Sequence, residues 1–355
     1  MKALVLSGGA GTRLRPITHT SAKQLVPLAN KPILFYGLEA IAAAGISDVG
    51  IVVGDTAPAI REAVGDGSAL GLSVTYLQQD APRGLAHAVL IARDYLGDEP
   101  FVMYLGDNLV VGGIADFVDE FERERPNALV LLTKVEHPEQ FGVAELGSDG
   151  SLVRLVEKPE NPPSDLALVG VYLFDETIHE AVTSIQPSWR GELEITDAIQ
   201  WLIEQGRTVR PHRLETPWID TGKRQDLLEA NRIVLAGIEV ADIRGTVDAG
   251  SRVSGSVIIE DGAEVVGSMV RGPAVIGAGA RIVNSYVGPY SSIGARCEVV
   301  DAEIEHSVVL EGARIEGVGR VDESIIGRNS QVRHGTTGPK TYRFLVGDDC
   351  EVDVL

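Results

Sequence analysis

The chain has few cysteines and no long apolar segment. Its 355 residues include two cysteines, Cys297 and Cys350, whose spacing fits neither a metal-ligand set nor a disulfide framework. Such cysteine usage suits a reducing compartment, so we expect a cytoplasmic protein. Because Gly8 and Gly9 interrupt the apolar start and no apolar run reaches about 18 residues, the sequence predicts neither a signal peptide nor a membrane-spanning helix.

Basic residues and nucleophile motifs are also scarce. There are 31 Lys and Arg against 51 Asp and Glu, a formal net charge of −20, which argues against a nucleic-acid or anionic-membrane partner. The sequence has no Gly-x-Ser-x-Gly elbow, and no histidine pair has zinc-protease spacing. A catalytic triad therefore has no support in the sequence.

The first 38 residues contain no acidic side chain at all. Inside this segment a glycine-rich turn, residues 8–13, follows the apolar run 3–6. The turn lacks the last glycine of a dinucleotide fingerprint and the Gly-Lys-Ser/Thr of a Walker A loop. An ordinary strand-to-helix turn would also contain glycines. The acid-free surroundings favour a polyanion held by backbone N–H groups and by the basic residues of the segment, which are Lys2, Arg13, Arg15, Lys23 and Lys31.

Strand and helix signals alternate from residue 1 to about residue 236. Apolar runs predict strands at 3–6, 49–53, 74–77, 101–105, 129–135, 143–146, 152–156 and 168–174. Helical spacing predicts helices at 32–44, 57–64, 85–95, 114–125, 194–205 and 223–235. This alternation indicates an α/β domain with a Rossmann-like mixed, mostly parallel sheet. Ligands of such sheets bind beyond the carboxyl ends of the strands, where Gly8 and Asp107 fall.

From about residue 240 the aliphatic residues acquire a period of 16 or 17. One series is Val253, Val270, Val287, Ile304 and Val321; a second is Ile259, Ile276 and Ile293; a third is Val265, Ile282, Val299, Ile315 and Val332. Three hexapeptides per coil are typical of a β-helix, in which each coil buries its aliphatic side chains against the next. We therefore expect two domains, residues 1–236 and residues 237–355.

Polar residues after the predicted strands are candidates for the chemistry. Asp107 and Asp220 offer the one or two carboxylates that Mg²⁺ prefers beside phosphates, or they serve as a turn residue and a helix N-cap. Lys158 holds a second phosphate as a point charge, or it forms a surface ion pair. Gln79 and Gly84 read a base edge, although an ordinary polar loop has the same sequence.

Seven segments carry, in order, the signature of one enzyme family. They are 8–16 (GGAGTRLRP), 23–25 (KQL), 106–108 (GDN), 141–143 (FGV), 157–159 (EKP), 190–197 (RGELEITD) and 218–222 (WIDTG). Up to about residue 236 the chain resembles the sugar-phosphate nucleotidylyltransferases, most closely the glucose-1-phosphate thymidylyltransferases. The tail resembles that of the long form, which has a left-handed parallel β-helix. Since the short form lacks this tail, its subunit contacts do not transfer.

The resemblance implies a role for each site residue. Arg13, Lys23 and Lys158 are catalytic, and Asp107 and Asp220 hold Mg²⁺. The nucleotide site consists of Leu6, Gly8, Gly9, Gly11, Thr12, Arg13, Gln24, Gln79, Gly84 and Asp107. The sugar-phosphate site consists of Asn108, Gly142, Glu157, Lys158, Tyr172 and Arg190. The implied substrates are dTTP and glucose 1-phosphate, and a homo-oligomer is expected.

The implied reaction needs no general base, because a phosphate monoester is already anionic at neutral pH. Attack on the α-phosphate brings two anions into line, so Mg²⁺, Arg13 and Lys158 would act by neutralising charge and positioning. Transfer from UTP is the nearest alternative, and Asn108 favours the thymidylyl branch by resemblance. Two others are an acetyltransferase tail with His306 or His334 as base, and a non-catalytic regulatory subunit, against which the retained charged residues speak.

Overall fold

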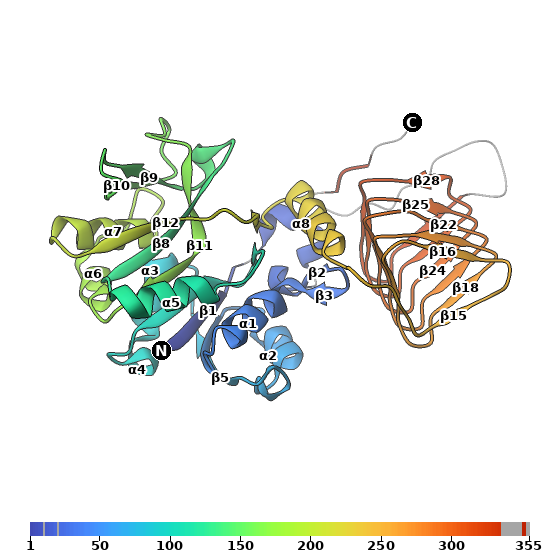
Figure 1. The fold of residues 1–355 in the computed structure, drawn as a ribbon, viewed down its shortest axis with the longest axis horizontal. Coiled ribbons are helices and arrows are strands. Elements are labelled where there is room, and N and C mark those ends of the chain that lie inside the picture. Colours follow the sequence, from blue (N-terminus) through green and yellow to red (C-terminus); the bar gives the residue numbers. More distant parts are fainter. Residues whose placement is uncertain (10, 20, 335–349, 353–355) are drawn as a thin grey trace. The chain divides into compact units, whose positions relative to one another are not determined.

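The computed structural model describes residues 1–9, 11–19, 21–334 and 350–352, which form two compact units (Figure 1). The first, here called the α/β unit, comprises Met1–Ala10, Ala22–Leu25 and Ile33–Asp220. The second, the β-helix unit, comprises Gly11–Ser21, Val26–Pro32 and Thr221–Leu355. The predicted boundary after residue 236 follows the change of sequence period, whereas these units follow compactness.

The α/β unit is built on a nine-stranded mixed sheet. Its core is parallel, in the order β6-β1-β4-β5, and the antiparallel part begins where β11 joins β6. The expected parallel arrangement is therefore found around β1, and β11 also pairs antiparallel with β8 and β9. The strands are β1 (Lys2–Ser7), β4 (Asp48–Val53), β5 (Ser73–Gln78), β6 (Phe101–Leu105), β8 (Ala128–Lys134), β9 (Gly142–Leu146), β10 (Leu152–Glu157), β11 (Leu166–Phe174) and β12 (Val209–Arg213).

Helices cover both faces of this sheet. Successive side chains of a strand point to opposite faces, and in β1 Ala3 and Val5 join one buried cluster while Leu4 joins another. The first cluster includes α1, α2 and α5, and the second includes α3, α4, α6 and α7. Apolar runs thus bury both faces of the central strands. The helices are α1 (Ile33–Ala43), α2 (Ala57–Val64), α3 (Leu85–Ile91), α4 (Arg93–Leu96), α5 (Ala115–Glu124), α6 (Ile178–Ser184) and α7 (Ile195–Glu204).

Most predicted elements are present, and the differences have local causes. The predicted strand 101–105 and helix 57–64 have the predicted bounds, whereas the single helix expected over 85–95 divides into α3 and α4 at Ala92. Two elements, α6 and β12, were not predicted from the sequence. Pro211 lies in β12, which pairs only with β8, and an edge strand tolerates a proline that a central strand would not.

The β-helix unit contains three parallel sheets, as the sequence period predicts (Figure 1). One consists of β14 (Asp242–Ile243), β17 (Val257–Ile259), β20 (Ala274–Ile276), β23 (Ser291–Ile293), β26 (Val308–Val309) and β29 (Ile325–Ile326). Another consists of β15 (Thr246–Val247), β18 (Glu264–Val266), β21 (Arg281–Val283), β24 (Glu298–Val300), β27 (Arg314–Glu316) and β30 (Gln331–Arg333). The third consists of β16 (Arg252–Ser254), β19 (Met269–Arg271), β22 (Tyr286–Val287), β25 (Glu303–Ile304) and β28 (Arg320–Val321).

The three predicted aliphatic series are the stacked interior columns of this β-helix. Val265 pairs with Ile282, Ile282 with Val299, and Val299 with Ile315, and the other two series pair in the same way. Most of these side chains form one buried cluster, and the partly buried Val253, Val321 and Val332 pack against it. Residues 335–349 and 353–355 of the predicted domain lie outside the described residues. The unit also holds β2 (Pro27–Leu28), β3 (Lys31–Pro32) and α8 (Arg224–Ala236).

Candidate active site

The glycine turn and Asp107 lie at the same edge of the sheet, as expected. β1 ends at Ser7 and β6 ends at Leu105, and the two strands are parallel neighbours that pair Leu6 with Leu105. The N–H of Gly106 donates a hydrogen bond to the carbonyl of Leu6 at 2.9 Å. The carboxyl ends of parallel strands meet at one edge, so both loops face the region where ligands of such sheets bind.

Lys23 brings the two candidate metal ligands together. Its buried Nζ contacts Asp107 Oδ2 and lies 3.3 Å from Asp220 Oδ1. The antiparallel pair β7 (Asn108–Val110) and β13 (Trp218–Asp220) explains this, because Asp220 stands opposite Asn108. Burial works to lower the pKa of Lys23, but the charges of Asp107 and Asp220 and their hydrogen bonds outweigh it and raise that pKa.

The carboxylates of Asp107 and Asp220 form a donor set that fits a divalent metal. Both have an oxygen beside one cation, the Lys23 ammonium, so the two oxygens face a common point. Carboxylate oxygen is the ligand that Mg²⁺ takes from proteins, with phosphates and water completing its shell. The ordinary alternative for Asp220 does not hold, because α8 begins later and its N-terminal Lys223 N–H is capped by Asp226 at 3.0 Å.

Two buried polar atoms next to these loops have no partner among the described residues. They are Ser7 Oγ and Gln24 Oε1, from side chains that are 0% and 2% exposed. Leaving a buried polar atom unpaired costs about 1–3 kcal/mol, so such atoms are rare unless a ligand or water uses them. Gln24 was predicted to bind nucleotide. Ser7 was missed, although its place directly after the apolar run and before Gly8 is a sequence signal.

The second half of the glycine turn belongs to the β-helix unit, and Ala10 lies outside the described residues. Gly11 has φ +61° and precedes a 3₁₀ turn, Thr12–Leu14, while Thr18 Oγ1 donates to the Gly11 carbonyl at 2.7 Å. The guanidinium of Arg13 lies against the backbone of Gly222, so close that a Cβ there would stand 2.9 Å from Nη2. Arg13 is thus held beside the segment that directly follows Asp220 in the chain.

Gln79 and Gly84, the predicted base-reading residues, have different local settings. Gln79 Nε2 lies 3.0 Å from His87 Nδ1, and Gln79 Oε1 would be 3.1 Å from a Cβ on Gly8, so Gln79 borders the glycine turn. Gly84 has φ +101° and packs against the backbone of Leu193, where a Cβ would come within 2.3 Å of the carbonyl oxygen. The close packing on Leu193 alone requires a glycine at this position.

A second charged cluster surrounds Glu157, at the end of β10. Its carboxylate lies 3.7 Å from Lys158 Nζ and 3.6 Å from Arg190 Nη1, and it accepts a hydrogen bond from Thr196 Oγ1 at 3.2 Å. Arg190 also pairs with Glu194 at 3.2 Å. Four of the predicted sugar-phosphate residues therefore share one cluster, since Gly142 lies so close to Glu157 that a Cβ there would stand 3.2 Å from Oε2.

The electrostatics of this cluster disfavour a charged Glu157. Burial and then the negative charge of Glu194 raise the pKa of Glu157, against the opposing charges of Lys158 and Arg190. Lys158 itself adopts φ +39°, an unusual conformation for a side chain other than glycine. A carboxylate kept in place against its own desolvation, beside two cations, is typical of a functional site.

Three predicted site residues pack into the fold, two of them buried and one partly buried. Asn108, which is 1% exposed, donates to Asp107 Oδ1 at 3.0 Å and accepts from the Trp218 indole at 2.6 Å, so it orients Asp107. Tyr172 stacks on Phe174 in the buried hydrophobic cluster that includes α3, α4, α6 and α7. Burial, followed by the charge of Glu157, raises the pKa of its phenol. The side chain of Leu6 also packs against this cluster. These positions suit support of the site more than contact with substrate.

Comparison with known proteins gives the family of the chain. The family model for nucleotidyl transferases matches residues 2–237. The chain belongs to the nucleotidyl transferase family. It is 59% identical over 100% of its length to a glucose-1-phosphate thymidylyltransferase of Streptomyces griseus and 57% identical over 100% to one of Streptomyces antibioticus, covering 99% of each. The alignments span the whole chain of this nucleotidyl transferase, so the β-helix is part of the shared sequence. The family generally uses a divalent metal.

A solved structure shares the fold of about two thirds of the chain. It is a Bacillus anthracis protein assigned as a glucose-1-phosphate thymidylyltransferase and crystallised with sucrose, 34% identical, with a TM-score of 0.62 over 66% of this chain and 94% of that one. Within the described residues, no helix combines the length and apolarity needed to cross a bilayer.

His306 of the β-helix pairs with Asp322 at 3.1 Å and stacks on Tyr290.

Proposed function

We propose that the chain transfers a thymidylyl group from dTTP to glucose 1-phosphate, giving dTDP-glucose and pyrophosphate. The observation that carries the proposal is the meeting of Lys23, Asp107 and Asp220 beside the glycine turn. It occurs in a chain 59% identical, from end to end, to a Streptomyces griseus enzyme named for this reaction. Since the nucleophile is already anionic, the site has to align two anions rather than remove a proton.

The proposed roles divide between two charged clusters, one of Lys23, Asp107 and Asp220 and the other around Glu157. Arg13 and Lys23 bind the triphosphate, and the Ser7 hydroxyl donates a hydrogen bond to it. Gln24 Oε1 can only accept, so it binds an N–H or O–H group of the nucleoside. Gln79 and Gly84 bind the thymine. Asp107 and Asp220 hold Mg²⁺, which when bound neutralises charge on the α-phosphate and the leaving pyrophosphate.

In the Glu157 cluster, Lys158 and Arg190 bind the attacking phosphate. Glu157 accepts hydrogen bonds from sugar hydroxyls and positions the two cations by ion pairing. Holding the nucleophile at a fixed position contributes rate because alignment is established before reaction. We also propose a homo-oligomer, to be checked by light scattering, and a cytoplasmic location, to be checked by fractionation.

A matrix of five nucleoside triphosphates against several sugar 1-phosphates, read as pyrophosphate release, tests the function. The highest kcat/KM is expected for dTTP with glucose 1-phosphate. A kcat/KM for UTP equal to or above that for dTTP would instead make the chain a uridylyltransferase.

A further inference from the structure

A buried asparagine of α8 joins three segments of the β-helix unit. Asn231 is 1% exposed, and its Oδ1 accepts hydrogen bonds from the Ala29 N–H at 2.8 Å and from Ser292 Oγ at 2.7 Å. Its Nδ2 donates to the Tyr290 carbonyl at 3.3 Å. The buried amide therefore connects the turn between β2 and β3, helix α8 and one coil of the β-helix.

The β2–β3 turn depends on these contacts. Ala29 and Asn30 have φ of 47° and 65°, a pair of left-handed residues of the kind found in two-residue hairpin turns. Neither is glycine, so the conformation needs support from its surroundings. Asn30 supplies it by donating its Nδ2 to the Ile293 carbonyl of the β-helix at 2.8 Å, next to the Ser292 contact with Asn231.

The preceding segment of the chain also lies on the β-helix. Pro16, Ile17 and Ser21 line a cavity of about 180 Å³ together with residues of the β-helix, among them Leu310 and Arg328. The two segments that contact the β-helix, Gly11–Ser21 and Val26–Pro32, stand on either side of Lys23–Leu25 in the chain. One of them contains Thr12 and Arg13.

We propose that Asn231 is a positioning residue for nucleotide binding, and that the β-helix supports, through Asn231, the segment that follows Lys23. The inference rests on the proposed function. Asn231 fixes the segment after Lys23, and the β-helix coil at residues 290–293 is the surface against which that segment is held. Weakening these hydrogen bonds weakens binding of dTTP and leaves binding of glucose 1-phosphate unchanged, because the residues of the Glu157 cluster lie outside the segments Gly11–Ser21 and Val26–Pro32 that flank Lys23.

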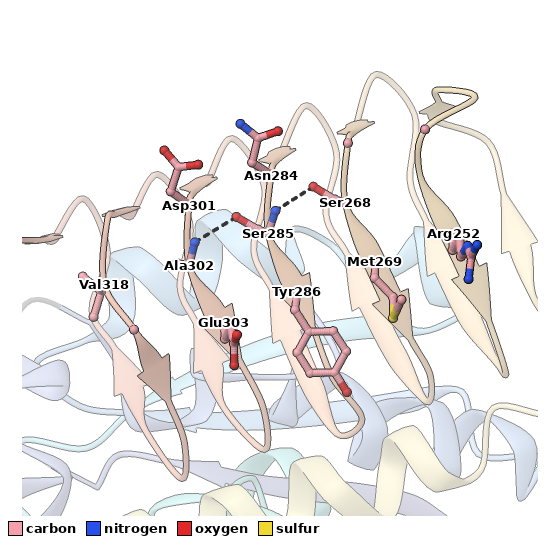
Figure 2. Close-up of a pocket in the computed structure, with 13 residues that line it drawn as sticks. Arg252, Ser268, Met269, Asn284, Ser285, Tyr286, Asp301, Ala302, Glu303 and Val318 are labelled. Atoms are coloured by element: carbon pink, nitrogen blue, oxygen red, sulfur yellow. Dashed lines mark hydrogen bonds between the residues drawn. The ribbon is translucent and has the colours of Figure 1, made fainter.

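Two variants weaken these hydrogen bonds without changing a residue of the proposed substrate or metal sites. Ser292→Ala removes one donor to Asn231, and Asn30→Gly removes the side-chain bond to Ile293 while keeping a residue that accepts positive φ. Ser285→Ala is the matched control. Ser285 is also a buried serine of the β-helix, but its hydroxyl bonds to backbone groups of its own coil and of the next one, as Figure 2 shows for the Ala302 N–H.

The readout is the KM of each substrate, paired with calorimetric titration of dTTP in Mg²⁺ and with melting curves. Both variants should raise the KM and Kd for dTTP by about three- to tenfold, the worth of one hydrogen bond, with the KM for glucose 1-phosphate within about twofold of wild type. Ser285→Ala should leave both KM values unchanged.

Two outcomes would overturn the inference. One is an unchanged dTTP affinity in both variants of an active enzyme, and the other is an equal rise for both substrates or in Ser285→Ala, which would indicate general loosening of the fold. A wild-type protein that makes no dTDP-glucose would refute the proposed function instead. The dTTP titration would still measure the effect of the two variants on nucleotide affinity.

Discussion

The two units of the molecule encode their structure in the sequence in different ways. In the β-helix, contacting residues are separated by one coil, as in the pair Val265 and Ile282, so the register appears directly as a period. In the α/β unit, the decisive contacts of Lys23 span 84 residues to Asp107 and 197 residues to Asp220. No periodicity reports such contacts, and only the type and order of the motifs indicate them. A regular fold is thus readable from local repetition, whereas a site assembled from distant loops is not.

The largest expected effect on activity comes from a variant that changes the active site but not the fold. Asp107→Asn removes one carboxylate charge from the proposed metal site, and kcat/KM should fall by at least about a thousandfold, as when preorganised charge is lost from an active site. Steady-state kinetics in Mg²⁺ measure the loss.

The melting temperature is the control for Asp107→Asn, and it should stay within a few degrees of wild type. Near-normal turnover in a folded variant would contradict the metal assignment.

The converse variant disturbs the β-helix repeat but leaves the catalytic residues unchanged. Ile282, in an interior column, is 0% exposed, and Ile282→Ala should lower the free energy of unfolding by about 2–5 kcal/mol through lost burial and a cavity. Urea denaturation measures it, with Met269→Ala as control, since Met269 is 43% exposed on the outside of the same β-helix. Equal costs at the two positions would mean that the aliphatic columns are not the core.

A third change separates the two substrate sites. Lys158→Ala should raise the KM for glucose 1-phosphate by about 10- to 100-fold, corresponding to a charged hydrogen bond of about 1.5–3 kcal/mol, with little effect on the KM for dTTP. Lys134→Ala is a suitable control, because Lys134 pairs with Asp165 on the exposed surface. A parallel loss of both affinities would move Lys158 out of the sugar-phosphate site.

The smallest expected effect is a pH-dependent gain in stability. Because the pKa of Glu157 is raised in the fold, its contribution to stability is present below its unfolded pKa and is lost as pH rises through the folded pKa. Glu157→Gln cannot ionise, so its melting temperature should exceed that of wild type at pH 8, and the difference should shrink as the pH falls toward about 4.5. A difference that grows toward low pH would reverse the assignment.

What could be predicted from the sequence follows the same division. The aliphatic columns and most strands of the α/β unit were predicted because burial leaves a pattern. The pairing of Asp220 with Asn108 could not be predicted, since it depends on two three-residue strands far apart in the chain. Ser7 was missed although it stands directly before Gly8, because this position does not reveal that its hydroxyl is buried without a partner among the described residues.

The central claim is that two aspartates distant in sequence hold one divalent cation beside the triphosphate. Its most direct test is a crystal of the full chain grown with Mn²⁺ and dTTP, in which the anomalous signal of manganese locates the ion. An anomalous peak is expected within ligand distance, about 2.0–2.3 Å, of carboxylate oxygens of both Asp107 and Asp220. A manganese ion bound to the triphosphate but to neither aspartate would contradict it.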